Sequence, residues 1–297
     1  MKSFLHHIIQ FFKVQHPWAL LWNSVWVGFT VFLNFYFKIS KAMLAWSLGW
    51  QLLFFVGIFT LIYGVSVLIH KKYYKLTLTK DFYLFFITAV LIFSFKSIPY
   101  HSEWTIYFPS FVPHQWEKPL FHWLVKDIVI LVTTVWFFRK LGGIGWIPGF
   151  SWKNVPWRII LVCWLIMIPL LFWAGFQPGF LAQYPKMSSL IEQGASKVQL
   201  LFFELLYSFD FLIIEVFFRG LLGIAAFQFL GEHAILTMAS FYCAIHFGKP
   251  LPECISSYFG GTILGVLALR SGKITSGFLI HVSVALGMEI TSYLGKK

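Results

Sequence analysis

Long apolar runs, separated by short segments rich in Lys, Pro or Gly, dominate the pattern of this chain. Most of them approach or exceed the roughly 20 residues that an α-helix needs to cross the hydrocarbon core of a membrane. The strands of a membrane barrel alternate apolar and polar residues, whereas these runs are unbroken. The pattern therefore predicts an all-α fold, a polytopic transmembrane helical bundle of about eight or nine spans.

The breaks between the runs set the expected boundaries of the spans. Residues 1–16 combine Phe, Leu and Ile with Lys and His, as in an amphipathic helix that lies at the membrane surface. Residues 100–119 lack a long apolar run, so we expect an extramembrane loop there. The nine expected spans are 17–37, 43–69, 82–95, 120–138, 157–176, 198–230, 233–247, 255–269 and 274–294.

The composition agrees with a membrane protein. Hydrophobic residues make up 59% of the chain and charged residues 11%, against about 45–50% and about 25% in soluble domains. The net charge is +12, but Lys and Arg lie at the ends of apolar runs, as at Lys71 and Lys72, without a basic cluster that would bind nucleic acid. This placement is typical of cytoplasmic loops that face anionic lipid. It predicts a multi-pass protein of the inner (plasma) membrane with membrane lipid as a partner.

Two charged residues lie inside the apolar run 198–230. Glu215 and Arg219 are four residues apart, so on one α-helix they share a face and can pair. A charge at membrane depth costs about 3 kcal/mol on insertion scales and usually faces a bundle interior or a wet cavity. His246 and His281 follow in later apolar runs. We expect Glu215, His246 and His281 to come from three helices and to face one polar cavity.

These residue types fit the hydrolysis of a peptide bond, which needs an activated water and a donor to the oxyanion. Glu215 and His246 would activate the water, and Arg219 would hold Glu215 ionised and in place. His281 would donate to the oxyanion. In a second version Glu215, His246 and His281 would hold a zinc ion with one open position. The sequence lacks the HExxH motif that would favour zinc strongly.

With these residues, the stretch 200–294 resembles the CPBP intramembrane proteases, also called the CAAX prenyl protease or Abi self-immunity family. The family motifs are Glu-Glu-x-x-x-Arg, Phe-x-x-x-His and His-x-x-x-Asn. The resemblance implies a catalytic core over residues 198–297, preceded by transmembrane helices of unassigned role over 1–197. It also implies a transmembrane or lipidated peptide as substrate. The matching positions are Ile214-Glu215-x-x-x-Arg219, Tyr242-x-x-x-His246 and His281-x-x-x-Ala285.

The chain departs from the family at two chemically important positions. Ile214 stands where the family has its first Glu, a favoured general base, and Ala285 stands where it has the Asn that is thought to stabilise the oxyanion with His. Two other functions therefore remain open. One is a catalytically inactive CPBP-like scaffold or chaperone. The other is a proton- or ion-coupled transporter that uses the same ionisable groups.

A second group of polar residues lies near these motifs. Pro250 favours a turn after His246, which would place Lys249 and Glu253 at the mouth of the site. Glu289 lies on the same helical stripe as His281, about 12 Å along the axis, and would replace a lost polar partner through water.

Overall fold

The computed structural model describes residues 2–99, 117–143, 147–153 and 155–296. These residues form helices, turns and loops without a strand, which confirms the predicted all-α fold. Of the expected loop 100–119, residues 100–116 lie outside the described residues. The chain divides into two compact units. The larger unit comprises residues 1–98, 132–150 and 216–274, and the smaller unit comprises residues 99–131, 151–215 and 275–297.

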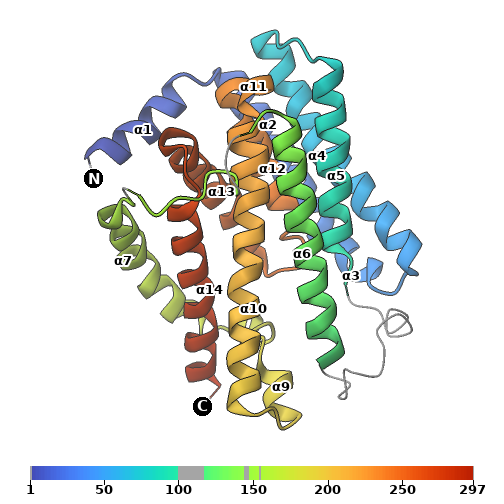
Figure 1. Cartoon of the computed structure of the whole chain (residues 1–297), viewed down its shortest axis with the longest axis vertical. Coiled ribbons are helices and arrows are strands. Elements are labelled where there is room, and N and C mark those ends of the chain that lie inside the picture. Colours follow the sequence, from blue (N-terminus) through green and yellow to red (C-terminus); the bar gives the residue numbers. More distant parts are fainter. Residues whose placement is uncertain (1, 100–116, 144–146, 154, 297) are drawn as a thin grey trace. The chain divides into compact units, whose positions relative to one another are not determined.

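The larger unit holds the amphipathic N-terminal helix, the first long apolar helices and most of the C-terminal third of the chain (Figure 1). The N-terminal helix begins and ends close to the prediction. The elements are α1 (Lys2–Lys13), α2 (Pro17–Tyr36), α3 (Ile39–Met43), α4 (Leu48–Tyr74), α5 (Lys80–Ser97), the π-helix η2 (Val216–Ala225), α11 (Phe227–Leu230), the 3-10 turn η3 (Gly231–His233), α12 (Ala234–Ala244) and α13 (Leu251–Ser271).

Helix α12 forms the core of the larger unit. All of its residues are buried, and it packs against α13, α4, α2 and η2. A buried polar network links four helices of this unit, because Asn23 of α2 donates to Ser240 of α12 at 3.1 Å and to Tyr258 of α13 at 2.9 Å. Ser66 of α4 donates to the Asn23 side-chain oxygen at 2.5 Å. Polar groups at membrane depth need such internal partners, since no water is present to bind them.

The smaller unit is organised around α14 (Thr275–Gly295), which packs against α7 (Trp157–Ala174) and α10 (Lys197–Glu215), as Figure 1 shows. Helix α10 begins at a capping box, in which the backbone amide of Ser196 donates to the Gln199 side chain at 2.8 Å and that of Gln199 to the Ser196 hydroxyl at 3.4 Å. The remaining elements are α8 (Pro178–Leu181), α9 (Ser188–Glu192) and the start of α6 (Glu117–Lys140), whose second half belongs to the larger unit.

Six of the described helices are long and apolar enough to cross a membrane, as expected for a membrane protein. They are α2, α4, residues 120–140 of α6, α7, α13 and α14. The expected number of eight or nine spans is not confirmed. Helix α12 has 11 residues and is about 16 Å long at 1.5 Å per residue, too short for a hydrocarbon core of about 30 Å. The expected span 198–230 changes helix type, because α10 ends at Glu215 and the π-helix follows directly.

Candidate functional site

A carboxylate and an imidazole are in direct contact in the smaller unit. Nδ1 of His281, on α14, lies 3.0 Å from Oε1 of Glu215, the last residue of α10. The Glu215 side chain is fully buried, whereas the His281 side chain is 15% exposed. The contact therefore joins a fully buried carboxylate to a ring that is partly exposed.

The residues one helical turn before each partner shape this contact. Phe211 precedes Glu215 by four residues on α10, and its ring centre lies 4.5 Å from that of His281. Gly277 precedes His281 by four residues on α14, and a Cβ atom added there would lie 2.5 Å from Oε2 of Glu215. The carboxylate thus lies against a position where any side chain would collide with it. Neither residue was singled out from the sequence, although the spacing of four residues was visible there.

The hydrogen bonds also fix the tautomers of the two histidines. An ionised carboxylate can only accept a hydrogen bond, so when Glu215 is ionised Nδ1 of His281 donates in this contact. Nδ1 of His246 lies 2.8 Å from the backbone oxygen of Tyr242, which also only accepts. In both neutral rings Nε2 therefore has the lone pair and is the basic atom. A neutral His281 cannot donate from Nε2, so the predicted oxyanion role requires the protonated ring.

The other predicted residues of the three motifs lie together in the larger unit. Arg219, on the π-helix, is completely buried, and its guanidinium carbon lies 4.2 Å from the centre of the Tyr242 ring. The Tyr242 ring is also in edge contact with His246, with ring centres 4.7 Å apart. Since Arg stacks well on aromatic rings, Tyr242 holds the guanidinium in a defined position.

The structure changes two local expectations about these residues. The shared face of Glu215 and Arg219 assumed one continuous α-helix, but the helix type changes between Glu215 and Val216. A π-helix has an i→i+5 bond pattern and is common at functional sites. His246 was expected within a span, whereas α12 ends at Ala244 and His246 lies in the turn that follows it. The predicted convergence of Glu215 and His281 with His246 involves both units of the chain and stays a prediction.

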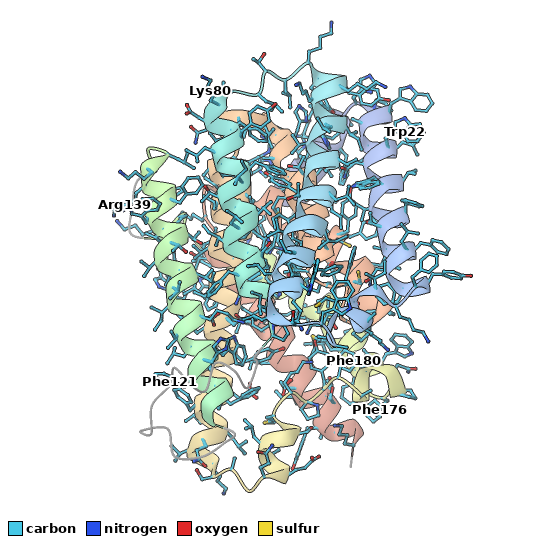
Figure 2. All side chains as sticks on the ribbon, turned by 90° about the vertical axis from the view of Figure 1, so that its right-hand side faces the viewer. Trp22, Lys80, Phe121, Arg139, Phe176 and Phe180 are labelled. Atoms are coloured by element: carbon cyan, nitrogen blue, oxygen red, sulfur yellow. The ribbon has the colours of Figure 1, made fainter. Side chains whose placement is uncertain are left out.

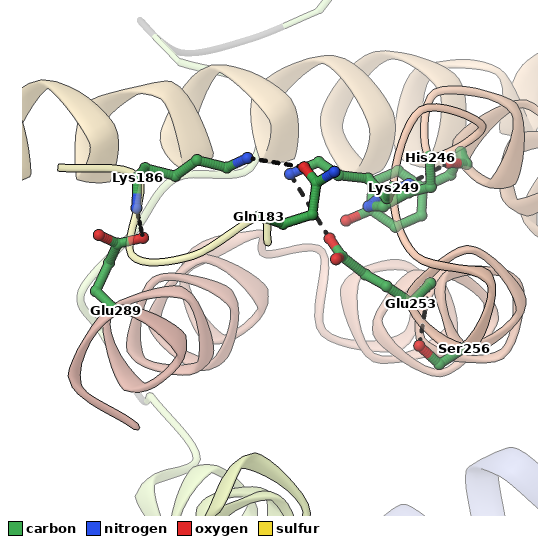
Figure 3. A network of polar contacts seen from close by, with 8 residues as sticks. Gln183, Lys186, His246, Lys249, Glu253, Ser256 and Glu289 are labelled. Carbon is green, nitrogen blue, oxygen red and sulfur yellow. Dashed lines mark hydrogen bonds and ion pairs between the residues drawn. The ribbon is translucent and has the colours of Figure 1, made fainter. Parts of the chain in front are cut away.

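Lys249 and Glu253 form an ion pair of 3.7 Å in the larger unit (Figure 3). The predicted turn is present, because Pro250 is the residue that precedes the first turn of α13. Both side chains are partly exposed, at 31% and 20%. A pair of this kind contributes little to stability, about 0–1 kcal/mol.

Glu289 has a partner of its own in the smaller unit. Its carboxylate accepts hydrogen bonds from the backbone amides of Lys186 at 2.8 Å and Met187 at 3.4 Å, and Figure 3 shows it facing the Lys186 amide. These bonds attach the loop before α9 to α14. They give Glu289 a role in positioning this loop, which was not predicted.

Ala285 lies in an apolar environment. It is 2% exposed and belongs to a hydrophobic cluster of the smaller unit. The other buried members are Leu120, Leu190, Phe203, Leu206 and Tyr207. The position that carries Asn in the CPBP family is therefore part of a packed apolar layer in this chain.

The zinc version of the site depends on how the donor atoms are placed. Within the residues that the structure describes, no group of three or more His, Cys, Asp or Glu side chains is placed to hold a metal ion. The Glu215 carboxylate binds the His281 ring directly instead. The zinc version needs His246 of the larger unit beside Glu215 and His281 of the smaller unit, so it stays a prediction.

Comparison with known proteins leaves the family open. No family model, curated protein or solved structure matches the chain. The resemblance to the CPBP family therefore rests on the three motifs alone.

Proposed function

We propose that this protein is a membrane-embedded peptidase in which Glu215 and His281 act as a carboxylate–imidazole pair. The observation that carries the proposal is their 3.0 Å contact, with the carboxylate buried and the ring partly exposed. The same relation of carboxylate, Nδ1 and basic Nε2 occurs in the catalytic triads of serine proteases. There the carboxylate orients the imidazole and stabilises its protonated form.

The hydrolysis proceeds in two steps, addition of water and collapse of the tetrahedral intermediate. Nε2 of His281 takes a proton from a water molecule, and the water oxygen adds to the carbonyl carbon of the scissile peptide bond. The tetrahedral intermediate then collapses, the C–N bond breaks, and His281 returns the proton to the leaving amine. The products are a carboxylic acid and an amine. Glu215 stays ionised throughout and stabilises the imidazolium that exists between the two steps.

This assignment differs from the prediction, in which Glu215 and His246 activate the water. Here His281 takes the proton from the water and Glu215 orients His281. A carboxylate hydrogen-bonded to Nδ1 of His281 is better placed to orient that ring than to take a proton itself. His246 supplies a second basic Nε2, held by the Tyr242 carbonyl, and Arg219 supplies a buried positive charge over the Tyr242 ring. The proposed substrate is a transmembrane or lipidated peptide of the inner (plasma) membrane, as the family resemblance implies.

The test compares Glu215→Gln, His281→Ala and the double variant in cleavage of a library of membrane peptides followed by mass spectrometry. Residues that act as one unit give non-additive losses. We expect each single variant to lower the rate about 10²–10⁴-fold and the double variant to be no slower than the slower single one. The exposed residues Glu192 and His6 give matched controls, Glu192→Gln and His6→Ala. Activity that survives in His281→Ala would contradict the proposed pair.

The non-catalytic alternative predicts a different result in the same assay. A scaffold or chaperone would bind membrane peptides without cleaving them. Peptides that copurify intact with both the unmodified protein and Glu215→Gln would support this alternative and refute the peptidase.

A proton- or ion-coupled transporter is the second candidate, favoured by the network of Asn23, Ser66, Ser240 and Tyr258. This network shows that buried polar residues are not confined to the C-terminal third of the chain. Buried polar groups in transmembrane helices often line ion pathways. Proton flux into liposomes that contain the protein, lost in both Glu215→Gln and Asn23→Leu, would support transport.

A further inference from the structure

A groove of about 350 Å³ lies between α2 and α4 in the larger unit. One stripe of α2 and one stripe of α4 form its walls, since the lining residues are spaced by three and four positions on each helix. Trp22, Trp26 and Phe29 line it from α2, and Ile69, Lys72 and Tyr73 line it from α4. Among the lining residues Lys72 is charged and the others are apolar or aromatic.

The two helices run antiparallel along the groove. Trp26 of α2 donates to the backbone oxygen of Ile62 at 3.3 Å, and Ser66 donates to Asn23 at 2.5 Å, so later positions on α2 pair with earlier ones on α4. The backbone amide of His16, just before α2, donates to the Tyr74 hydroxyl at the end of α4. The groove therefore has Lys72 at the end nearest the start of α2, and Phe29 towards its other end.

The outer side of the groove is exposed on the protein. Trp22 and Phe29 are each 49% exposed, and Figure 2 shows Trp22 on the outer side of α2. Both α2 and α4 are among the helices able to cross a membrane. In a membrane these aromatic side chains therefore face acyl chains, while Trp22 and Tyr73 have the amphipathic character typical of the interface.

The charged end of the groove has the features of a headgroup site. Nζ of Lys72 lies 5.6 Å from the centre of the Tyr73 ring, and Lys71 and Lys75 lie at the same helix end. Lysines beside the end of a transmembrane helix attract anionic lipid headgroups. Lys72 differs from its neighbours because it also lines the apolar groove.

We propose that this groove binds one anionic phospholipid, with an acyl chain along the aromatic walls and the headgroup phosphate at Lys72 and Tyr73. Trp22 and Phe29 are seven residues apart, which is about 10 Å along α2. Over this length the lining from α2 is apolar or aromatic, and the charge of the groove lies at one end, at Lys72. A phospholipid matches this order, because its acyl chain can lie along the apolar walls while its anionic phosphate pairs with Lys72. The site is independent of the proposed peptidase.

Native mass spectrometry of the intact protein in detergent tests the proposal, with phosphatidylglycerol and phosphatidylcholine of identical chains as probes. We expect phosphatidylglycerol to bind more tightly. Lys72→Ala should weaken it about fivefold, the contribution of one lysine to anionic lipid binding. Lys71→Ala is the matched control, because Lys71 is exposed beside Lys72 but does not line the groove. Trp22→Ala should weaken both lipids by removing a section of the wall.

Several outcomes would overturn the proposal. Equal binding of the two lipids, or an equal loss of phosphatidylglycerol affinity in Lys71→Ala and Lys72→Ala, would show that Lys72 does not recognise the headgroup. Full competition by inorganic phosphate would indicate a phosphate site without an acyl chain. If Lys72→Ala does not fold, Lys72→Gln and Phe29→Ala test the two ends of the groove separately, and unchanged lipid binding in both refutes the proposal.

Discussion

Replacing Gly277 by Ala perturbs the Glu215–His281 contact without changing either partner. The new Cβ would lie 2.5 Å from Oε2 of Glu215, whereas ordinary contacts begin at 3.4 Å, so the two atoms must separate by about 0.9 Å. Because Glu215 is completely buried, its carboxylate can yield only by rotating away from His281 or by pushing α10 and α14 apart. Either response strains the 3.0 Å hydrogen bond.

Two effects set the expected loss of stability, the overpacking by the new Cβ and the strained hydrogen bond. Overpacking a well-filled interior costs about 1–3 kcal/mol, and a hydrogen bond to a charged group contributes about 1.5–3 kcal/mol. We expect Gly277→Ala to lower the free energy of unfolding by about 2 kcal/mol, which corresponds to a melting temperature lower by about 4–8 °C. The assay is thermal unfolding of the detergent-solubilised protein, with peptide cleavage measured on the same samples.

A double-mutant cycle shows whether the carboxylate is the cause. In the Glu215→Ala background Oε2 is gone, so Gly277→Ala should cost about 1–2 kcal/mol less than in the unmodified protein, within the range of coupling between residues in contact. Gly260→Ala is the control, because nothing lies within 4 Å of a Cβ atom at this position of α13. Equal costs of Gly277→Ala in both backgrounds would refute the described contact.

Three further predictions concern other places in the molecule. Ala285→Asn should lower stability by about 1–3 kcal/mol in the same thermal assay, because it buries an amide in an apolar cluster; an Asn variant as stable as Ala285→Val would contradict this. Burial, and secondarily the charge of His70, lowers the pKa of His233 from 6.5 to about 4, and His233 lies outside the six membrane-crossing helices. The unfolded chain then binds this proton more readily, so stability should fall as the pH decreases from 6.5 to about 4, and His233→Gln should flatten that fall. The sulfur atoms of Cys243 and Cys254 lie 3.8 Å apart. A small disulfide oxidant should join them with loss of two hydrogens, and peptide mapping in a Cys163→Ser background detects the bond. Failure to form this bond would contradict the packing of α12 on α13.

The apolar pattern predicted helices well where a run is long and ends at a clear signal. The helix predicted over 17–37 is Pro17–Tyr36, and the one predicted over 157–176 is Trp157–Ala174. The pattern could not distinguish a membrane span from a short buried helix. For this reason the region of α12 was predicted as a span. A run below about 15 residues is compatible with either, and only the packing of α12 on four neighbours decides it.

The change of helix type at Val216 could not be predicted from the sequence either. Residues 198–230 are continuously apolar except for a few charged or polar side chains, without a Pro or an internal signal that would end a helix before Gly220. The π-helix carries Phe217 and Phe218, which are completely buried in the larger unit. Glu215 and His281 were identified by type and spacing, because ionisable groups stand out in apolar runs. Their direct contact depended on the packing of α10 against α14 and needed the structure.

Ile214 and Ala285, the two departures from the CPBP motifs, both lie in apolar parts of the chain. Ala285 is a buried member of an apolar cluster, and Ile214 is half-buried on an apolar stretch of α10. The Ala285 side chain therefore matches its apolar surroundings. The Glu215–His281 contact, by contrast, places a charged group where burial is costly unless it is hydrogen-bonded. The proposed hydrolase needs both the oriented ring and the carboxylate behind it. The contrast between two apolar positions and one buried, hydrogen-bonded carboxylate supports the proposed catalysis with a single Glu.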